Sequence, residues 1–307
     1  MKIMKKILPF NEQSYKLHAD HFKDYAGTGE LADHAKSWMR SDTVDAWRHQ
    51  RMYRLLDPIL QYDPGSSWLT VGDGRFGKDA KEIEKRGGVA LATDISEHLL
   101  AEAKSIGYIK NYRIENAESL SFENDSFDYV FCKESFHHFP RPMIALYEML
   151  RVSRKGVILI EPNDPLADKG LSSLLFNGIK NAVKSLLGRK MESHFFEPSG
   201  NYVYTLSEPE IEKAAIGLGL QWIASFRLND SYVKGAEYEM LSENGPLQKR
   251  VNRTIRRKNV LSAAGLMPYE MIATVLFKEK PSKELIAILS DHGYKISELP
   301  VNPYINS

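Results

Sequence analysis

The sequence is poor in cysteine, in net charge and in long apolar runs. Its single cysteine, Cys132, excludes an internal disulfide and a metal site built from several cysteines, and it favours a reducing, cytoplasmic compartment. The 41 basic and 40 acidic residues leave a formal charge of +1, which gives no overall attraction to nucleic acid or to an acidic membrane. No stretch approaches the roughly 20 apolar residues that a membrane-spanning helix needs, so we expect no integral membrane segment.

Short apolar runs that are typical of strands alternate with segments of helical spacing. The 307 residues, 43% of them hydrophobic, leave room for one large α/β domain with additions. The seven expected strands are 68–71, 89–93, 112–114, 127–132, 156–160, 222–227 and 273–277. The helices expected between them are 78–86, 96–106, 142–152 and 208–218. This alternation predicts a doubly wound, mostly parallel seven-stranded sheet, whose ligands bind beyond the carboxyl ends of its strands.

Segments outside this alternation divide the chain further. We expect an N-terminal helical extension at 1–62, a core domain at 63–280 with insertions at 163–204 and 229–269, and a C-terminal extension at 281–307. Helical spacing from Leu31 to Tyr62 ends at the turn Asp63-Pro64-Gly65. These helices either pack over a ligand site or cover an edge of the sheet.

The stretch Ser67 to Asp79, SWLTVGDGRFGKD, combines a strand, a glycine turn and a helix start. Gly72, Gly74 and Gly77 supply backbone angles that other residues resist, and they let a ligand approach the main chain. The following helix offers unpaired N–H groups to a polar or anionic ligand. On its own this G-x-G-x-x-G pattern is a weak signal.

An acidic residue, Asp94, ends the second expected strand about 20 residues after the glycine turn. A carboxylate at this distance is suited to accept hydrogen bonds from both hydroxyls of a ribose. The alternative is a capping role at the helix that follows. Because NAD and S-adenosylmethionine both contain such a ribose, this part of the sequence does not separate hydride transfer from methyl transfer.

The segment Asn116 to Pro162 separates these two possibilities. It contains Ala117-Glu118, the phrase Leu120 to Asp128, the pair His137-His138 and the helix motif Glu148 to Val152. In this combination the sequence resembles the class I S-adenosylmethionine-dependent methyltransferases, especially the small-molecule branch that includes quinone-biosynthesis C-methyltransferases. The resemblance implies a Rossmann-like methyltransferase fold, S-adenosylmethionine as cofactor and a small-molecule acceptor.

The resemblance also implies which residues bind the cofactor. Ala117 and Glu118 fall where the family meets the adenine, and the end of the fourth strand falls where the methionine end and the activated methyl group lie. The glycine turn departs from the family pattern, because Thr70 stands where an acid is usual, and Asp73 is suited to replace that acid by facing the methionine ammonium. The cofactor-binding residues expected are Thr70, Gly72, Asp73, Gly74, Phe76, Asp94, Ile95, Ala117, Glu118, Lys133 and Glu134.

His137 and His138 are the candidate catalytic residues. A histidine with a pKa near neutrality is able to take the proton of a hydroxyl while that hydroxyl attacks a methyl group. The alternative is that one or both pack structurally. Glu161, Asn163 and Asp164 follow the fifth strand on the same edge of the sheet as further polar candidates. No His/Asp/Glu cluster has a spacing diagnostic of a metal, and metal dependence stays open.

The insertion 163–204 is the candidate lid and acceptor pocket. Its helical apolar face and the aromatic run after it are suited to close a dry cavity around reacting groups. We expect Asn163, Tyr202 and Tyr204 to contact the acceptor. The alternatives are a helix that packs on the sheet layer and a helix that makes peripheral contact with a membrane.

The run from Lys249 to Lys258 holds six basic residues and no acid. Such a run is typical of a solvated face, although Arg250, Arg253 and Arg257 would share one side of a helix and suit a phosphate. One basic run in a nearly neutral chain gives a poor footprint for nucleic acid.

The combined motifs predict a methyltransferase that moves the methyl group of S-adenosylmethionine to an oxygen of a sugar or natural-product-like metabolite. Transfer to nitrogen or carbon is the less favoured variant. An NAD(P)-dependent oxidoreductase would use the glycine turn and Asp94 but leaves 116–162 unexplained. A non-catalytic binding protein of the same fold is the third hypothesis. The acceptor and the oligomeric state are not encoded in any motif.

Overall fold

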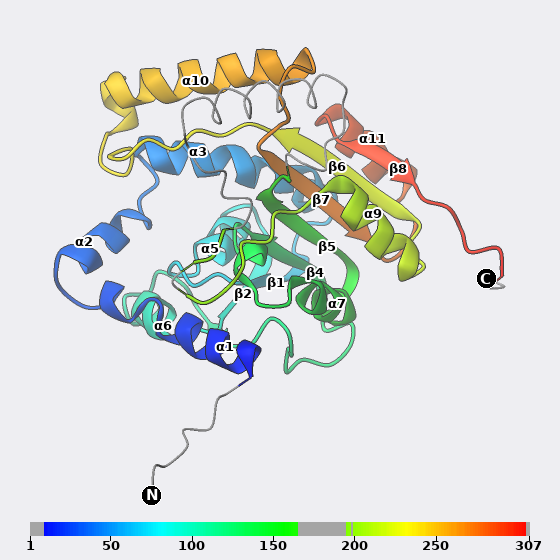
Figure 1. Ribbon diagram of the computed structural model, residues 1–307, viewed down its shortest axis with the longest axis horizontal. Helices are drawn as coiled ribbons and strands as arrows, with labels where there is room; N and C mark the ends of the chain where they lie inside the picture. Colours follow the sequence, from blue (N-terminus) through cyan, green and yellow to red (C-terminus); the bar gives the residue numbers. More distant parts are fainter. Residues whose placement is uncertain (1–8, 165–194, 198, 305–307) are drawn as a thin grey trace, which may run out of the picture.

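The computed structural model describes residues 9–164, 195–197 and 199–304 (Figure 1). In these residues eight strands form one sheet, in the order β3-β2-β1-β4-β5-β7-β6-β8. Their bounds are β1 Ser67–Val71, β2 Val89–Asp94, β3 Tyr112–Ile114, β4 Phe127–Lys133, β5 Ser153–Pro162, β6 Trp222–Leu228, β7 Met271–Phe277 and β8 Lys295–Glu298. Strands β1 to β5 pair in parallel, and β7, β6 and β8 add antiparallel pairs. The doubly wound, mostly parallel α/β fold is confirmed.

The strand count corrects the prediction of seven, because the segment 281–307 adds helix α11 (Lys283–Asp291) and strand β8. Strand β8 is only four residues long and pairs antiparallel with β6 at the sheet edge. Its sequence, KISE, holds a single apolar residue, Ile296. So short and polar a stretch carries no strand pattern of its own, and only pairing with β6 makes it a strand.

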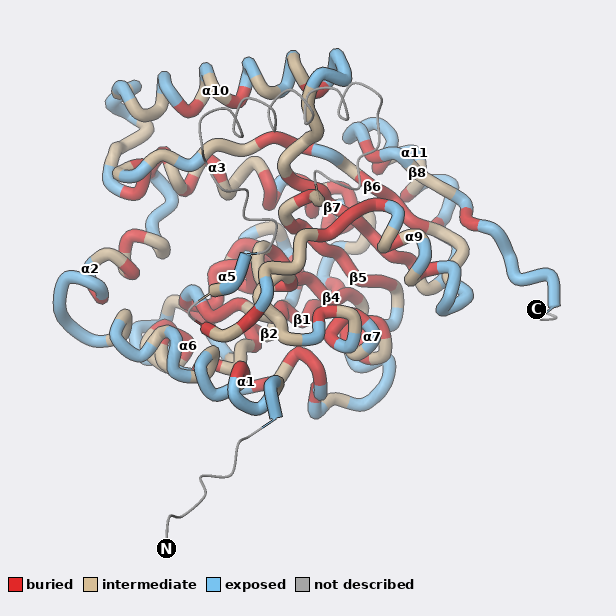
Figure 2. Tube along the Cα trace, viewed as in Figure 1, coloured by how far each residue is buried: buried red, intermediate tan, exposed pale blue. Residues whose placement is uncertain are grey.

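Helices cover both faces of the sheet. The α-helices are α1 Phe10–Asp20, α2 Glu30–Ser37, α3 Val44–Tyr53, α4 Asp57–Tyr62, α5 Lys78–Lys85, α6 His98–Ser105, α7 Pro142–Val152, α9 Glu208–Gly217, α10 Pro246–Ala263 and α11. Alternate residues of β5 take part in two separate cores: Ile158 lies in one with α4 and α11, and Val157 lies in the other with α7 and α9. Buried residues follow the strands, whereas the outer sides of α1 and α10 are exposed (Figure 2).

The strand order reverses between β1 and β4. From β1 the chain passes through β2 to β3 on one side of the sheet, and β4 pairs with β1 on the other side. A crevice opens outside the carboxyl ends of parallel strands at such a reversal, and ligands of this fold class bind there. The turns after β1, β2 and β4 all lie at this edge, so we expect a ligand-binding site there.

The basic run lies on α10, which packs on α3 through Val251 and Ile255. Lys258 pairs with Glu270 at 2.6 Å, whereas Arg250, Arg253 and Arg257 are exposed. The expected helix of the insertion 163–204 falls within 165–194, outside the described residues. In the part of the chain that the structure describes, no helix is long and apolar enough to cross a membrane.

Candidate functional site

The turn after β1 has no room for side chains at two of its glycines. A Cβ atom on Gly74 would lie 2.5 Å from Cε2 of Phe22 and 2.7 Å from Oδ2 of Asp94. A Cβ on Gly72, where φ is +76°, would lie 2.5 Å from Cβ of Ser135. The Ser135 hydroxyl instead donates a 2.7 Å hydrogen bond to the Gly72 carbonyl. The bare turn therefore brings the ends of β1, β2 and β4 within contact distance of one another.

Asp73 holds the start of α5. Its carboxylate accepts hydrogen bonds from the backbone N–H groups of Asp79 and Ala80 at 3.0 and 2.9 Å, and from the Thr70 hydroxyl at 2.8 Å. Burial raises the pKa of Asp73 well above its usual range, and the neighbouring Asp79 carboxylate adds to the increase. We expected this carboxylate to face the methionine ammonium, but three protein groups already donate hydrogen bonds to it. The main role of Asp73 in the structure is therefore to cap the N-terminus of α5.

Thr70 and Phe76 require a correction. The Thr70 side chain is fully buried, and its hydroxyl donates a hydrogen bond to Asp73. Phe76 has a left-handed backbone, with φ of +61°, and its ring is fully buried in a core with Ala80 and Leu99. Neither residue lines the cavity described below. The sequence pattern predicted a turn correctly but did not show which side chains point beneath it.

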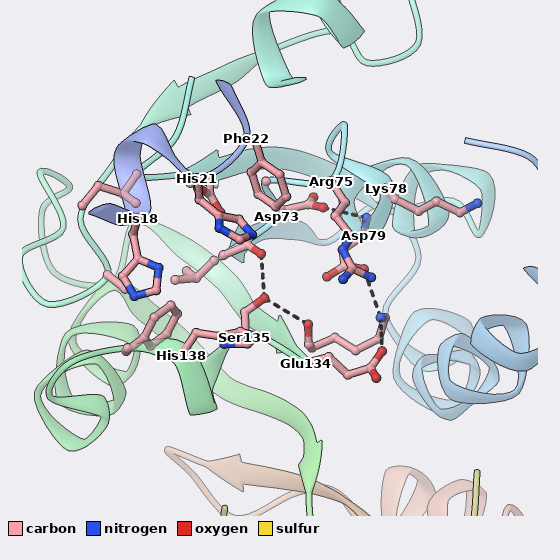
Figure 3. A pocket seen from close by; sticks show the side chains of 18 of the residues that line it. His18, His21, Phe22, Asp73, Arg75, Lys78, Asp79, Glu134, Ser135 and His138 are labelled. Carbon is pink, nitrogen blue, oxygen red and sulfur yellow. Dashed lines mark hydrogen bonds and ion pairs between the residues drawn. The ribbon is translucent and has the colours of Figure 1, made fainter. Parts of the chain in front are cut away.

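A cavity of about 400 Å³ opens beside this turn (Figure 3). That volume lies within the range of natural small-molecule sites. The predicted cofactor residues on its wall are Gly72, Asp73, Gly74, Asp94, Ile95, Ala117, Glu118, Lys133 and Glu134, and the predicted catalytic residue on it is His138. The structure thus gathers residues from four separate strand ends around one space.

At one part of the cavity Asp94 lies with Ile95, Ala117 and Glu118. One Asp94 oxygen accepts a 2.7 Å hydrogen bond from the Ser96 N–H, so the capping role is present together with a place on the cavity wall. Burial raises the pKa of Asp94 to about 6. A partly desolvated carboxylate of this kind favours a ligand that supplies hydroxyl donors.

The Glu118 carboxylate joins the N-terminal helix to the sheet edge. It accepts hydrogen bonds from the Tyr15 hydroxyl at 2.6 Å and from the Arg141 side chain and backbone at 2.6 and 2.7 Å. These partners leave the carboxylate little capacity for a base, so the backbone of 116–118 is the better candidate for contact with an adenine. The side chain serves to hold α1 in place.

Charges of both signs surround another part of the cavity, beyond the end of β4. Lys133 Nζ lies 3.0 Å from the Glu134 carboxylate and 3.9 Å from that of Asp79. Burial alone would raise the pKa of Glu134, but Lys133 and His49 outweigh it and hold the pKa well below its usual range. Arg75 and Lys78 also line the space (Figure 3). Such a mixture suits a zwitterion, whose ammonium and carboxylate need partners of opposite sign.

The histidine pair divides between two roles. His137 Nδ1 lies 2.6 Å from Glu161, whose fully buried carboxylate also accepts from the backbone N–H groups of Ser135 and Phe136. Burial lowers the His137 pKa, but the Glu161 charge outweighs it and raises the pKa. His137 is not on the cavity wall, and its contact with Glu161 favours the structural alternative, so its catalytic role stays a prediction.

His138 lines the cavity and contacts Glu197 through Nδ1. Its Nδ1 lies 2.5 Å from a Glu197 oxygen, and the hydrogen bond from His138 lowers the pKa of Glu197 to about 2. A carboxylate that accepts from Nδ1 orients the ring and leaves Nε2 as the free nitrogen. The tautomer is assigned from this hydrogen bond. His138 therefore has the surroundings of a general base.

The three predicted acceptor contacts lie away from the cavity wall. Asn163 donates a 2.9 Å hydrogen bond to the Tyr269 carbonyl, and the Tyr204 hydroxyl bonds Glu210 at 2.8 Å. Tyr202 lies on the surface, with its ring edge-to-face against Phe196. None of the three lines the cavity, so the structure does not bring them to the candidate site, and their contact with an acceptor stays a prediction. The Asn163 amide and the Tyr204 hydroxyl already bond neighbouring elements.

The structure adds a wall that the motifs did not reveal. Tyr15, His18, His21 and Phe22 come from α1 and the residue pair after it, and Trp38 and Arg40 follow α2. His18, His21 and Phe22 stand at helical spacing in HADHF, which is the one signal that could have shown a shared face. Of the two alternatives for the N-terminal helices, packing over the site is the one that the structure shows.

In the described ranges, no group of three or more His, Cys, Asp or Glu side chains is arranged to hold a metal ion. The two histidines nearest each other, His137 and His138, have ring centres 4.0 Å apart but turn to different carboxylates. Each of these two rings is thus bonded to a protein carboxylate.

Part of the chain matches known proteins. Residues 69–160 match a family described as a methyltransferase domain. The chain is 32% identical over 139 residues to a ubiquinone/menaquinone biosynthesis C-methyltransferase of Rhizobium etli, which is 41% of the chain and 54% of the relative. It is 32% identical over 129 residues to a demethylmenaquinone methyltransferase of Bacillus cereus, which is 39% of the chain and 52% of the relative.

The chain spans about half the length of these curated relatives. Among solved structures, it resembles magnesium protoporphyrin IX methyltransferase from Synechocystis with bound S-adenosylmethionine, with a TM-score of 0.48 and 13% identity. That similarity covers 89% of the chain and 99% of the solved structure.

Proposed function

Because residues 69–160 form a class I S-adenosylmethionine-dependent methyltransferase domain, we propose that the chain binds this cofactor in the cavity and transfers its methyl group to a small-molecule acceptor. The observation that carries the proposal is the Asp94 carboxylate, which lines the same cavity as the bare glycine turn and the mixed charges beyond β4. A nucleoside with an amino-acid tail needs all three. The match to a methyltransferase domain argues against the nicotinamide alternative.

In this proposal, different residues bind different parts of the cofactor. Asp94 accepts the ribose hydroxyls, and the backbone of 116–118 meets the adenine. Lys133, Arg75 and Glu134 provide partners for the methionine carboxylate and ammonium. Gly72 and Gly74, where no Cβ fits, let the ligand lie against the main chain. The bound cofactor supplies a methyl group on a sulfonium, which leaves with its bonding electrons on sulfur.

We assign the acceptor to the part of the cavity around His138. An acceptor hydroxyl placed there donates to Nε2 of His138, and its proton passes to that nitrogen as oxygen bonds to the methyl carbon. The carbon–sulfur bond breaks in the same step, and the electron pair remains on sulfur. Glu197 stabilises the imidazolium that forms. The remaining task of the site is to align the groups and exclude water.

A second candidate transfers the methyl group to carbon. One curated relative is named a ubiquinone/menaquinone biosynthesis C-methyltransferase, and the other is named a demethylmenaquinone methyltransferase. In a hydroxylated ring, loss of the hydroxyl proton to His138 makes the neighbouring ring carbon nucleophilic, so the same base would serve. The two candidates differ in the atom that carries the new methyl group, and the product distinguishes them.

Calorimetry with S-adenosylmethionine, S-adenosylhomocysteine and NAD tests the binding part of the proposal. We expect both S-adenosyl compounds to bind and NAD not to bind. Binding of NAD alone would overturn the proposal, and binding of none would favour a non-catalytic protein of the same fold. Incubation with methyl-labelled cofactor and a metabolite extract then tests turnover, because mass spectrometry of the labelled product identifies the methylated atom.

A further inference from the structure

The outer side of helix α10 carries a row of basic side chains. The five that are exposed, which we call the basic face, are Lys249, Arg250, Arg253, Arg256 and Arg257. On the opposite side of the helix, Val251 and Ile255 are buried and pack on α3. Helix α10 lies along the rim of the molecule with α3 beneath it (Figure 1), and its outer side is exposed (Figure 2). The helix thus presents five cations outward.

The basic face has no acidic partners. Helix α10 contains no Asp or Glu, and in the described ranges none of the five cations forms an ion pair. Lys258, to the side of the row, does pair with Glu270 at 2.6 Å. Glu239, before the helix, instead accepts hydrogen bonds from the backbone N–H groups of Leu247 and Gln248. The described part of the chain therefore does not neutralise the basic face.

The spacing of the basic face is unfavourable for the helix itself. Arg253 stands four residues after Lys249 and four before Arg257, so these like charges are neighbours on one surface. Like charges at this spacing repel one another and destabilise a helix, whereas a face that alternates bases with acids avoids the cost. Anions bound along the row would remove the repulsion, so the spacing favours an acidic partner.

The distribution of charge in the chain favours a directed contact. The formal charge of the whole chain is only +1, so the part outside the basic face is net acidic. An acidic surface would attract the molecule at α10 and repel it elsewhere. The basic face is therefore suited to orient the molecule on such a surface.

Exposed apolar side chains continue the row at its end. Val260 stands one turn after Arg256, and Leu266 follows the end of the helix. Their exposed fractions are 69% and 50%. Cations that reach phosphates, next to apolar side chains that reach deeper, are typical of a helix that lies in the interface of a bilayer.

Nucleic acid is the other acidic partner that the charge would attract. Single strands bind by stacking their bases on aromatic side chains, and α10 contains no aromatic residue. A duplex offers phosphates but no apolar layer for Val260 and Leu266. The apolar end of the row therefore favours a lipid surface.

We propose that α10 docks the protein on a bilayer that contains anionic lipids. The basic face contacts the head-group phosphates and carboxylates, and Val260 and Leu266 lie at the edge of the acyl layer. Each basic residue strengthens the contact by about fivefold, and salt weakens it by screening. No residue of α10 lines the cavity, so this inference is independent of the proposed function.

Cosedimentation of the 307-residue chain with vesicles tests the proposal. The vesicles consist of phosphatidylcholine alone or of phosphatidylcholine mixed with phosphatidylserine. We expect partitioning onto the anionic vesicles to exceed that onto the neutral ones by at least about tenfold, and to fall as salt rises. Equal partitioning onto both kinds of vesicle, or none onto either, would overturn the proposal.

A triple variant assigns the binding to α10. Arg253→Gln, Arg256→Gln and Arg257→Gln together should lower partitioning by about 100-fold, because three charges leave the basic face. The matched control removes three exposed lysines on α1, α9 and α11, through Lys16→Gln, Lys213→Gln and Lys283→Gln. It changes the net charge equally but should lower partitioning by about twofold at most, since charges away from the contact are screened. Equal losses in the two variants would contradict the proposal.

Substitution of the apolar end separates lipid from nucleic acid. Val260→Ser together with Leu266→Ser should lower vesicle partitioning by about tenfold. Undiminished partitioning of this variant, or tight binding of the unaltered chain to a DNA duplex without binding to vesicles, would overturn the lipid assignment. Thermal unfolding checks the fold of each variant. Failure of every variant and of the unaltered chain to bind S-adenosylhomocysteine would count against the proposed function and leave the vesicle result in force.

Discussion

The cavity has two walls of different origin. One is made by strand ends, with the glycine turn, Asp94, 116–118 and Lys133 to Ser135 held by the ladder of parallel β-pairs. The other is made by residues 15–49, which lie on short helices outside the sheet. Strand pairing along β1, β2 and β4 holds the first wall. The second wall is held by side-chain contacts and by a few backbone hydrogen bonds between 42–45 and 236–241.

The strand wall follows from the sheet itself, whereas the helical wall is an addition of this chain outside the sheet. Lys78 ties the second wall down by donating to the carbonyls of Trp38 and Arg40, both at 2.6 Å. Tyr15 ties it at the other end through Glu118. The strand wall binds the cofactor in our proposal, and the helical wall lines the opposite side of the cavity. Substitutions in the two walls should therefore have different effects.

The largest effect is expected where the two walls touch. Gly74→Ala places a methyl group against Phe22 of the helical wall and Asp94 of the strand wall. We expect S-adenosylhomocysteine affinity to fall by about 3 kcal/mol, or roughly 150-fold, because the overlap closes the cavity. Gly217→Ala is the control, since its Cβ would meet nothing within 4 Å. Unchanged affinity in calorimetry would show that the walls separate easily.

The second-largest effect is expected from a substitution in the strand wall alone. Asp94→Ala removes the carboxylate assigned to the ribose, and S-adenosylhomocysteine binding should weaken by about 1–3 kcal/mol. Unaltered affinity would mean that Asp94 only caps α6 through Ser96.

A smaller effect should follow from pH. Burial raises the Asp94 pKa to about 6 in the free protein, so the carboxylate is mostly ionised above that pH and mostly protonated below it. Affinity for S-adenosylhomocysteine should fall by about tenfold for each pH unit below about 6 as the acceptor is lost. Asp94→Asn should flatten this dependence. For stability the sign is reversed: a raised pKa favours the protonated folded state, so this residue's contribution declines as pH rises toward 6.

The smallest effect tests the helical wall. Tyr15→Phe removes the hydroxyl that bonds Glu118 and receives a bond from Arg141. We expect cofactor affinity to fall by about 1 kcal/mol, or roughly fivefold, since Arg141 still holds Glu118. Amide exchange of α1 should accelerate in the same variant. A loss as large as that of Gly74→Ala would mean that α1 is part of the rigid frame.

The strand wall was predictable because its signals are local. A glycine turn after an apolar run, an acid at the end of the next strand and the 116–162 motifs each depend on residues close in sequence. Beyond this, the pattern could not show side-chain direction. Phe76 and Thr70 stand among wall residues in the sequence but point into the core, because a left-handed backbone and a buried hydroxyl bond turn them away.

The helical wall was not predictable for a physical reason. His18 lies about 120 residues from His138, and no spacing in the sequence brings them together. The different roles of His137 and His138 have the same origin, because each ring is oriented by the carboxylate it contacts. That carboxylate is Glu161 of β5 for His137 and Glu197, within the insertion 163–204, for His138. A wall of this kind is formed by tertiary contacts, and such contacts leave no periodic pattern in the sequence.

The helix α1 has only one buried residue, Ser14, and the link to α2 contains Gly27 and Gly29 with no neighbouring atoms within 4 Å of a Cβ. So lightly attached a segment should open at low free energy cost, and a ligand beneath it raises that cost by mass action. Cleavage of the native chain by a protease at Ala26 to Gly29 would then slow as the cavity fills. The helix that hides the site would serve as a gauge of its occupancy, readable on a gel.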